Sequence, residues 1–568
     1  MSQDERQAHG GAQAIAAARR HGVQALFTLS GGHIFPVYDG AVRADPPMPI
    51  VDVRHEQTAV FAAEAMARLT RTPGFAALTA GPGATNGVSA VTSAHFNGSP
   101  LVVLAGRAPD GRWGSGSLQE LDHPPLLAPV TKRAWTVHEP GQVGAATDEA
   151  FALASSRHRG PVFLDASLEA LYGTGSLPGA QPQPPATGTL GPDGADARAK
   201  RDQPDPDAIT AIARLLAGAS RPVLILGSDI WLDGAEHAAR AAAEELQLPV
   251  IANGQGRGVL PSGHPLLVTR ARSLALGEAD LVLVAGTPLD FRLGYGSFGG
   301  KNGTPPARVV HLADAPELIA THCELAGSAS GELAAIFSGL ANAAGTGTAA
   351  GAAWTQDWLP RLQAISKQAT ADDAALLASS ANPVHPLRIY GELATLLADD
   401  AVIIGDGGDF VSYAGKYVEP QQPGGWLDPG PYGCLGTGLG YAIAARLARP
   451  TAQVVLLLGD GAAGFSLMDA DTLVRHGLPV VMICGNNGIW GLEKHPMQAL
   501  YGYDVAADLQ PGCRYDQVVT ALGGGGEVVT DPADIGPALR RAFDSGIPYL
   551  VNVITDPSDA YPRSTTGV

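Results

Sequence analysis

Two apolar runs near the carboxyl end of the sequence finish in oxygen-bearing side chains. Asp460 follows one run in a GDG motif, and 24 residues separate this motif from the NNG motif that contains Asn487. Mg²⁺ accepts carboxylate, amide and carbonyl oxygens when phosphate oxygens complete its shell, so the carbonyl of Ile489 is a third candidate ligand. Gly459 and Gly461 let the backbone approach a phosphate closely. The pattern predicts a site for magnesium and a diphosphate.

Each motif also has a simpler interpretation as an ordinary turn between a strand and a helix. Together, at this spacing, they favour one phosphate site, to which Ala462 contributes at the amide end of the following helix. The sequence contains no GxxxxGK[ST] segment, so the common nucleotide-binding loop is not an alternative.

A further carboxylate lies far away in the sequence. Glu56 follows a short strand that ends near Val53, and it begins the amphipathic segment EQTAVFAAEAMAR. Taken alone, a glutamate at a helix start is typical of a favourable contact with the helix dipole. Three nearby loop segments can carry the rest of a site: LSGGHIFPVYD (29–39), TAGPGATNG (79–87) and GSLQELDH (116–123).

These motifs together resemble the signature of the thiamine diphosphate (ThDP)-dependent enzymes, and the similarity covers nearly the whole chain. The resemblance implies that Glu56 binds the aminopyrimidine ring of the cofactor, with Pro82 and Asn86 in the loop over that ring. It also implies that His33 and Gln119 face the reacting carbonyl group of the substrate.

The segment PYGCLGTGLGYAIAA resembles the family segment in which a large apolar residue wedges between the two rings of ThDP. Leu435 falls at that position, and a core-facing helix residue is its alternative interpretation. The pyrimidine motif lies early in the chain and the diphosphate motif lies late. The resemblance therefore implies active sites completed between two subunits, in a homodimer or a homotetramer.

Short apolar runs alternate with amphipathic stretches from end to end, which is typical of parallel α/β units. A Pro- and Gly-rich segment and a later low-complexity segment interrupt this alternation. We expect three doubly wound α/β domains with parallel sheets. They are a pyrimidine-binding domain (1–176), a central domain (205–342) and a diphosphate- and magnesium-binding domain (376–555), with linkers at 177–204 and 343–375 and a tail at 556–568.

The composition narrows the partners that this protein can have. The formal charge of -18 disfavours nucleic acid or an anionic membrane as the main partner. Four scattered cysteines indicate neither a disulfide framework nor a zinc site. No apolar run approaches the roughly 18 residues needed to span a bilayer. These features favour a cytoplasmic protein.

The segment 256–296 resembles the branch of the family that uses coenzyme A (CoA). In that branch Arg272 and Ser273 are candidate contacts for CoA. The short polar tail carries Arg563 and Ser564, which are candidates for closing over a CoA thioester substrate, although a frayed terminus is the more common state of such a segment.

Glu493 stands where acetolactate synthases carry an apolar pocket residue, six positions after Asn487. A helix that starts at the metal would let its side chain reach above the thiazolium ring. A buried carboxylate persists only where it is paired or used. We expect Glu493 to move the proton of a substrate hydroxyl. A solvated glutamate paired with Lys494 or His495 is the alternative.

The resemblance as a whole implies a ThDP-dependent carbon–carbon lyase. It would cleave a 2-hydroxyacyl-CoA, for example the short branched 2-hydroxyisobutyryl-CoA, reversibly to formyl-CoA and an aldehyde or ketone. The alternatives are an acetolactate synthase that condenses two pyruvates, an oxalyl-CoA decarboxylase, and a protein that keeps ThDP without catalysis. The sequence leaves open whether ADP or FAD occupies the central domain.

Overall fold

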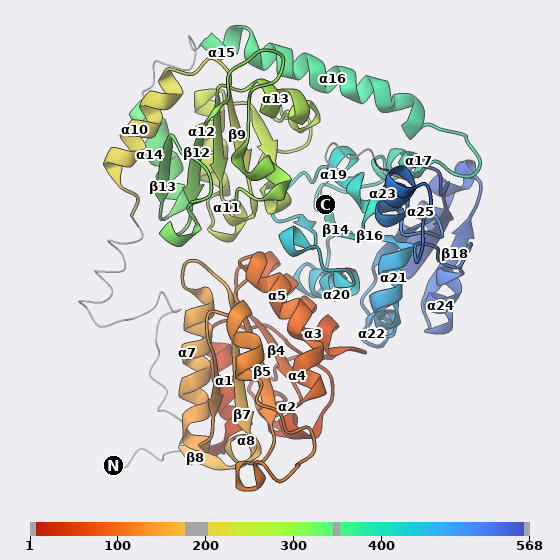
Figure 1. The fold of residues 1–568 in the computed structure, drawn as a ribbon. Coiled ribbons are helices and arrows are strands. Elements are labelled where there is room, and N and C mark those ends of the chain that lie inside the picture. Colours follow the sequence, from red (N-terminus) through yellow and green to blue (C-terminus); the bar gives the residue numbers. More distant parts are fainter. Residues whose placement is uncertain (1–6, 177–202, 345–352, 560, 562–568) are drawn as a thin grey trace.

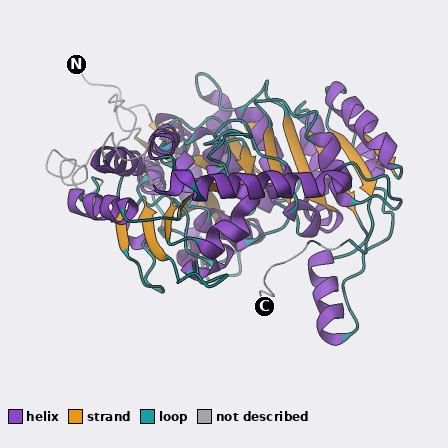
Figure 2. Cartoon of the chain, turned by 90° about the horizontal axis from the view of Figure 1, so that it is seen from above, coloured by secondary structure: helices purple, strands orange, loops and turns teal. Residues whose placement is uncertain are grey.

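The computed structural model describes residues 7–176, 203–344, 353–559 and 561. Three parallel sheets, each flanked by helices, succeed one another along the chain (Figure 1). Seen from above, the strands lie between helices throughout the described chain (Figure 2). The predicted fold class of three doubly wound α/β domains is confirmed.

The N-terminal part contains a six-stranded parallel sheet in the order β3-β2-β4-β5-β7-β6. Its strands are β2 (Leu26–Thr28), β3 (Ile50–Asp52), β4 (Gly74–Leu78), β5 (Leu101–Arg107), β6 (Ala134–Val137) and β7 (Pro161–Ser167). The main helices are α1 (Gly10–Arg20), α2 (Phe35–Arg43), α3 (Glu56–Thr70), α4 (Pro82–Asn86), α5 (Val88–Phe96) and α7 (Val143–Ser155). A small antiparallel ribbon pairs β1 (Gln7–His9) with β8 (Thr174–Ser176).

The central part contains a five-stranded parallel sheet in the order β10-β9-β11-β12-β13. The strands are β9 (Pro222–Leu226), β10 (Val250–Ala252), β11 (Leu281–Ala285), β12 (Arg308–Ala313) and β13 (Gly327–Ser330). The helices are α10 (Pro206–Ala217), α11 (Ser228–Leu232), α12 (Glu236–Leu246), α13 (Arg272–Glu278) and α14 (Leu333–Ala344). From β9 the chain passes to β10 on one side of β9 and then to β11 on the other side. The gap between β9 and β11 is therefore the topological switch point of the sheet.

The C-terminal part contains a six-stranded parallel sheet in the order β15-β14-β16-β17-β19-β18. The strands are β14 (Val402–Asp406), β15 (Trp426–Leu427), β16 (Val454–Gly459), β17 (Val481–Asn486), β18 (Gly525–Val529) and β19 (Tyr549–Ile554). The helices are α17 (Pro386–Leu393), α18 (Asp409–Ser412), α19 (Ala414–Tyr417), α20 (Thr437–Ala448), α21 (Asp460–Ser466), α22 (Ala470–Arg475), α23 (Gly491–Tyr501), α24 (Tyr515–Ala521) and α25 (Ile535–Asp544).

The segment expected as the second linker is largely helical. It contains α15 (Ala353–Gln356) and most of α16 (Trp358–Leu377), which runs from the central part toward the C-terminal part (Figure 1). The buried Trp358 indole donates a hydrogen bond of 3.1 Å to the carbonyl of Pro222, so α16 is fixed to the central sheet. Residues 177–202 of the first linker lie outside the described residues.

One hydrophobic core joins the N-terminal and C-terminal sheets. Helices α3 and α20 pack so closely that a Cβ on Gly440 would lie 2.8 Å from the Cβ of Phe61, and the rings of Phe61 and Tyr441 meet edge to face. Thr58 of α3 also donates a hydrogen bond of 2.6 Å to Asp469. Among the described residues, no helix has both the length and the apolar character needed to cross a membrane.

Candidate active site

Asp460 and Asn487 lie at the ends of neighbouring parallel strands, because β16 pairs with β17. The buried Asp460 carboxylate accepts hydrogen bonds from the backbone N–H of Gly461 (2.9 Å) and of Gly488 (2.6 Å). The amide oxygen of Asn487 accepts one from Ile489 at 3.2 Å. Burial raises the pKa of Asp460 to about 6, although the amides of Gly488 and Gly461 oppose this. A hard cation would stabilise this buried carboxylate, so the donor set fits Mg²⁺.

The glycines of the GDG motif have two different roles. A Cβ on Gly461 would lie 2.4 Å from the ring of Trp490, so the packing of this indole requires glycine. A Cβ on Gly459 would meet no atom within 4 Å, which leaves open space at the start of α21. Ala462 is buried in the first turn of the same helix. The residues present therefore fit a diphosphate group that approaches the backbone at Gly459.

The loop that carries Leu435 is held by Asp406 at the end of β14. The buried Asp406 carboxylate accepts hydrogen bonds from the N–H groups of Gly436 (3.1 Å) and Gly438 (2.8 Å). Burial raises the pKa of Asp406 to about 7, against the lowering effect of these bonds. The side-chain amide of Gln57 donates to the Leu435 carbonyl at 3.3 Å, so the start of α3 lies beside this loop within one chain.

Glu56 is the first residue of α3, and its carboxylate is buried. The side-chain amide of Asn86 donates a hydrogen bond of 3.0 Å to it. A Cβ on Gly83, in the same loop, would lie 3.8 Å from the Glu56 carboxylate. Pro82 begins α4 and is exposed. The structure therefore brings together Glu56, Asn86 and the GPG loop.

Thr79 links the other two predicted residues of this region. Its hydroxyl lies 3.2 Å from Nδ1 of His33 and donates to the Gln119 side chain at 3.5 Å. Burial lowers the pKa of His33, and the nearby His123 adds to this. Gln119 has a left-handed backbone conformation with φ of 60° and lies against Gly81. Thr79 was not singled out from the sequence, although it begins the TAGPG motif.

A fully buried histidine fixes the start of the GPG loop. His123 Nε2 accepts a hydrogen bond of 2.9 Å from the N–H of Gly81, and its Nδ1 lies 2.9 Å from Asp165. Because a backbone N–H can only donate, Nδ1 carries the proton of the neutral ring. Arg107 forms ion pairs with this Asp165 carboxylate (3.3 Å) and with the carboxylate of Asp122 (2.9 Å). His123 ends the GSLQELDH segment, and its role depends on a partner that the sequence does not indicate.

Glu493 lies in the first turn of α23 and is exposed in this chain, rather than buried as expected. Lys494 forms ion pairs with Asp504 (3.3 Å) and Asp508, so this lysine is engaged elsewhere. In the described part of the chain, no hydrogen bond or ion pair involves the Glu493 carboxylate. The alternative of a glutamate paired with Lys494 or His495 is not what the structure has.

Arg272 lies near two other arginines, at the start of α13. It donates to the carbonyl of Arg292 at 2.9 Å, and burial, with Arg257 and Arg292 nearby, lowers its pKa to about 10. Arg257 is paired with Glu419 (2.8 Å) and Arg292 with Asp290 (2.7 Å). In the described chain, Arg272 makes no ion pair.

Ser273, which follows Arg272, is exposed. The tail reaches the region around Arg272. The N–H of Tyr561 donates to Asp409 at 2.8 Å, and its ring packs edge to face against Tyr413. The predicted residues Arg563 and Ser564 lie outside the described residues.

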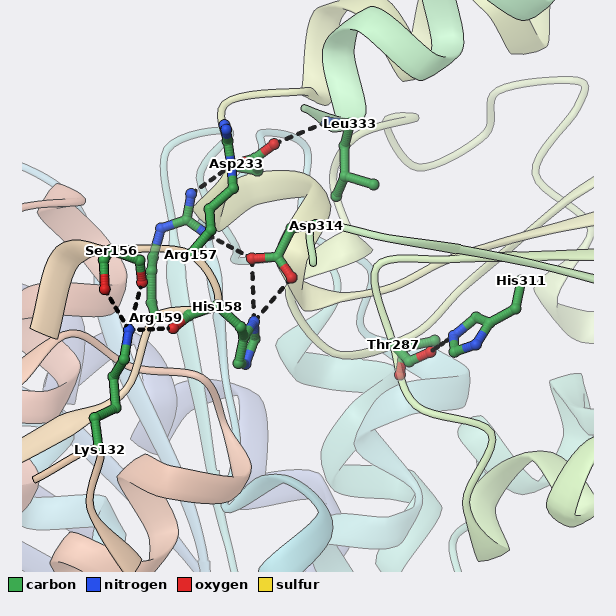
Figure 3. A network of polar contacts seen from close by, with 10 residues as sticks. All are labelled: Lys132, Ser156, Arg157, His158, Arg159, Asp233, Thr287, His311, Asp314 and Leu333. Carbon is green, nitrogen blue, oxygen red and sulfur yellow. Dashed lines mark hydrogen bonds and ion pairs between the residues drawn. The ribbon is translucent and has the colours of Figure 1, made fainter. Parts of the chain in front are cut away.

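Among the described residues, the loops after β9 and β12 of the central sheet give no support for bound ADP. Asp229 follows β9 and Asp314 follows β12, and both carboxylates are buried. Arg157, His158 and Arg159 of the N-terminal part contact these loops (Figure 3). Asp314 pairs with His158 and Arg159, so these charges are already used within the protein, and the expectation of ADP has no support here.

Three domains of one family match the amino-acid sequence. They are the N-terminal TPP binding domain of the thiamine pyrophosphate enzymes (residues 8–126), their central domain (209–336) and their C-terminal TPP binding domain (406–553). The parallel α/β sheets and the Asp460–Asn487 strand ends are what such a cofactor site requires. The chain belongs to the thiamine diphosphate-dependent enzyme family.

Two kinds of relative lie within this family. The acetolactate synthase large subunit IlvG of Mycobacterium tuberculosis is 49% identical over 559 residues, covering 98% of this chain and 97% of that protein. The 2-hydroxyacyl-CoA lyase 2 of Homo sapiens is 33% identical over 592 residues, covering 97% of this chain and 90% of that protein. The lyase 2 of Caenorhabditis elegans is likewise 33% identical over 591 residues, with coverage of 97% and 90%.

Proposed function

We propose that this enzyme cleaves a short 2-hydroxyacyl-CoA, such as 2-hydroxyisobutyryl-CoA, to formyl-CoA and an aldehyde or ketone. The observation that carries the proposal is Arg272, a largely buried guanidinium with two further arginines nearby and no ion pair in the described chain. CoA carries phosphate groups that would compensate this charge, and guanidinium groups bind phosphate oxygens through paired hydrogen bonds. Pyruvate, by contrast, carries only a carboxylate.

The place of Glu493 supports the same reaction class. Its helix begins four residues after Asn487, and Lys494 is held by Asp504 and Asp508. The Glu493 carboxylate is therefore available to accept the proton of a 2-hydroxyl group, directly or through one water. Removal of that proton is what permits the bond between carbons one and two to break.

The other residues divide into anchoring and reacting groups. ThDP, when bound, supplies the electron sink for bond cleavage. Asp460, Asn487 and the carbonyl of Ile489 would hold Mg²⁺ and, with Gly459, Gly461 and Ala462, the diphosphate. Glu56 would hold the aminopyrimidine ring, oriented by Asn86. His33 and Gln119, joined through Thr79, would donate hydrogen bonds to the carbonyl oxygen of the thioester.

Acetolactate synthesis from two pyruvates is the second candidate. It is favoured by the 49% identity to a relative that carries that name. Oxalyl-CoA decarboxylation is a third reaction within the CoA-using branch. It would release CO₂ together with formyl-CoA, so product analysis separates it from the lyase reaction.

The test supplies the enzyme, loaded with Mg²⁺ and ThDP, with 2-hydroxyisobutyryl-CoA, oxalyl-CoA or pyruvate, and measures formyl-CoA, acetone, CO₂ and acetolactate. The proposal expects formyl-CoA and acetone in equal amounts. Arg272→Ala should raise KM for the CoA thioester at least about tenfold, since loss of one charged hydrogen bond costs about 1.5–3 kcal/mol. The exposed Arg308 serves as a matched control. Acetolactate alone would contradict the proposal.

Glu493→Gln tests the proton transfer separately. The substitution keeps the size of the side chain and removes its basicity. We expect kcat to fall about 10²-fold or more, with KM little changed. An unchanged kcat would show that another group accepts the proton.

We further propose a homodimer or homotetramer with active sites between subunits. Large apolar side chains exposed on α21 to α23 and just beyond support it: Phe465, Met468, Leu500, Tyr501, Tyr503 and Val505. Co-expression of Glu56→Gln with Asp460→Asn tests the shared site. If sites lie between subunits, mixed dimers regain one intact site and activity, whereas sites within one chain would leave every mixture inactive.

A further inference from the structure

The switch point of the central sheet carries an ionic cluster that the proposed reaction does not use. It lies where the N-terminal part meets the ends of β9 and β12 (Figure 3). His158 comes from the loop between α7 and β7, whereas Asp229 is the second residue of the short helix α11 and Asp314 follows β12. In parallel α/β sheets, this crevice is where ligands bind.

Most charges in this crevice are paired. Asp233 binds Arg157 (2.8 Å) and Arg159 (2.6 Å), and it accepts a hydrogen bond from the N–H of Leu333. Asp314 binds Arg159 at 3.2 Å and also contacts the ring of His158.

A lysine from the segment before β6 is directed at backbone and hydroxyl oxygens of this loop. The ammonium group of Lys132 is hydrogen-bonded to the carbonyl and hydroxyl of Ser156 and to the carbonyl of His158 (Figure 3). Lys132 therefore fixes the loop that presents His158.

Asp229 is the exception in this crevice. Its side chain is 7% exposed, and no hydrogen bond or ion pair of its carboxylate is found among the described residues. Burial, with Asp314 nearby, raises the pKa of Asp229 to about 7. A buried carboxylate without a partner is costly, and a bound cation would remove that cost.

We propose that His158, Asp229 and Asp314 form a binding site for one divalent cation between the N-terminal and central parts. One ligand atom from each residue, a ring nitrogen and two carboxylate oxygens, lies within 4.8 Å of the others. Ligand atoms at about 2.1 Å from a metal lie roughly 3.5 Å apart, so small side-chain movements would close the shell.

The chemistry of the donors selects the cation. One imidazole and two carboxylates suit Zn²⁺ or Mn²⁺, whereas Mg²⁺ prefers an all-oxygen shell with several waters. The site is separate from the Asp460–Asn487 strand ends in the C-terminal sheet. Because its ligands come from two parts of the chain, the cation would hold the central part against the N-terminal part.

The test uses the full-length enzyme saturated with Mg²⁺ and ThDP. It is titrated with Zn²⁺ or Mn²⁺ alone, and bound metal and Tm are measured. We expect about one equivalent of added metal per chain, with a Tm that rises until this site is filled. Asp229→Asn keeps the shape of the side chain, so it should fold normally, yet it should lose the added equivalent and the rise in Tm. His158→Ala should lose both as well.

Two further variants make the outcome decisive. Glu317→Gln changes an exposed acidic residue shortly after Asp314 and should bind the cation like the unaltered enzyme. Asp460→Asn should also keep the added equivalent, because it alters only the site at β16. The proposal is wrong if the unaltered enzyme binds no Zn²⁺ or Mn²⁺ tightly, or if Asp229→Asn retains the full equivalent.

Discussion

The backbone N–H of Gly81 donates a 2.9 Å hydrogen bond to Nε2 of the fully buried His123. Gly81 precedes the loop that contacts Glu56, and its Cβ position would collide with Gln119. One imidazole therefore sets the position of a loop that lies between Glu56, which we propose binds the pyrimidine ring, and the proposed carbonyl-binding pair. Asp165 fixes the tautomer that makes this possible.

His123→Ala should weaken ThDP binding about tenfold or more. The Gly81 N–H would lose its acceptor, and an unsatisfied buried donor costs about 1–3 kcal/mol. Titration of the enzyme with ThDP in excess Mg²⁺ measures the change in Kd. His123→Gln retains an acceptor and should recover part of the affinity. His138→Ala, at an exposed histidine of the same sheet region, should change little.

Gly459→Ala should separate folding from cofactor binding. The added Cβ meets no protein atom within 4 Å, so the Tm of the cofactor-free protein should change little. The same methyl group would occupy the space proposed for the diphosphate, so Kd for ThDP should rise at least about tenfold. Gly141→Ala, also in open space but far along the chain, is the control. Equal ThDP affinity in both variants would argue against a diphosphate at Gly459.

Asp460→Asn should abolish turnover and ThDP binding at cellular concentrations of Mg²⁺. The amide keeps the shape of the side chain but removes the charge that compensates the metal. Chelation of Mg²⁺ from the unaltered enzyme should have the same effect, and readdition should reverse it. Asp471→Asn, at an ion pair nearby on α22, should remain active. The measurements are turnover and ThDP Kd across a Mg²⁺ titration.

Asp406 should make stability depend on pH. Its pKa is about 7 in the folded protein, against an ordinary value of 3.8, because it is buried. Between these values the folded state holds a proton that the unfolded chain releases, so this contribution is complete below pH 3.8 and is lost as pH rises through about 7. Asp406→Asn removes it. As pH rises from 4 to 8, the Tm of the unaltered protein should therefore fall steadily relative to the Tm of the variant.

The sequence predicted the elements whose signals are local. The strand ends at Asp460 and Asn487 and the helix start at Glu56 follow from apolar runs and glycines. The structure has Asp460 and Asn487 at the ends of the neighbouring strands β16 and β17, and Glu56 at the start of α3. The sequence did not predict the roles of three residues: Thr79, His123 and Asp406. Each role depends on burial or on a partner 40 or more residues away in the sequence, as Gln119 is from Thr79. Glu493 was expected to be buried, but the structure exposes it in the first turn of α23.

The core shared by α3 and α20 determines how the enzyme unfolds. Phe61 and Tyr441 belong to one apolar cluster that spans both outer sheets, so each sheet loses part of its core if the other melts. Heat or denaturant should therefore dismantle the two cofactor-binding regions in a single step. A substitution deep in α3, such as Phe61→Ala, would loosen the phosphate-binding end of the molecule although it touches no ligand.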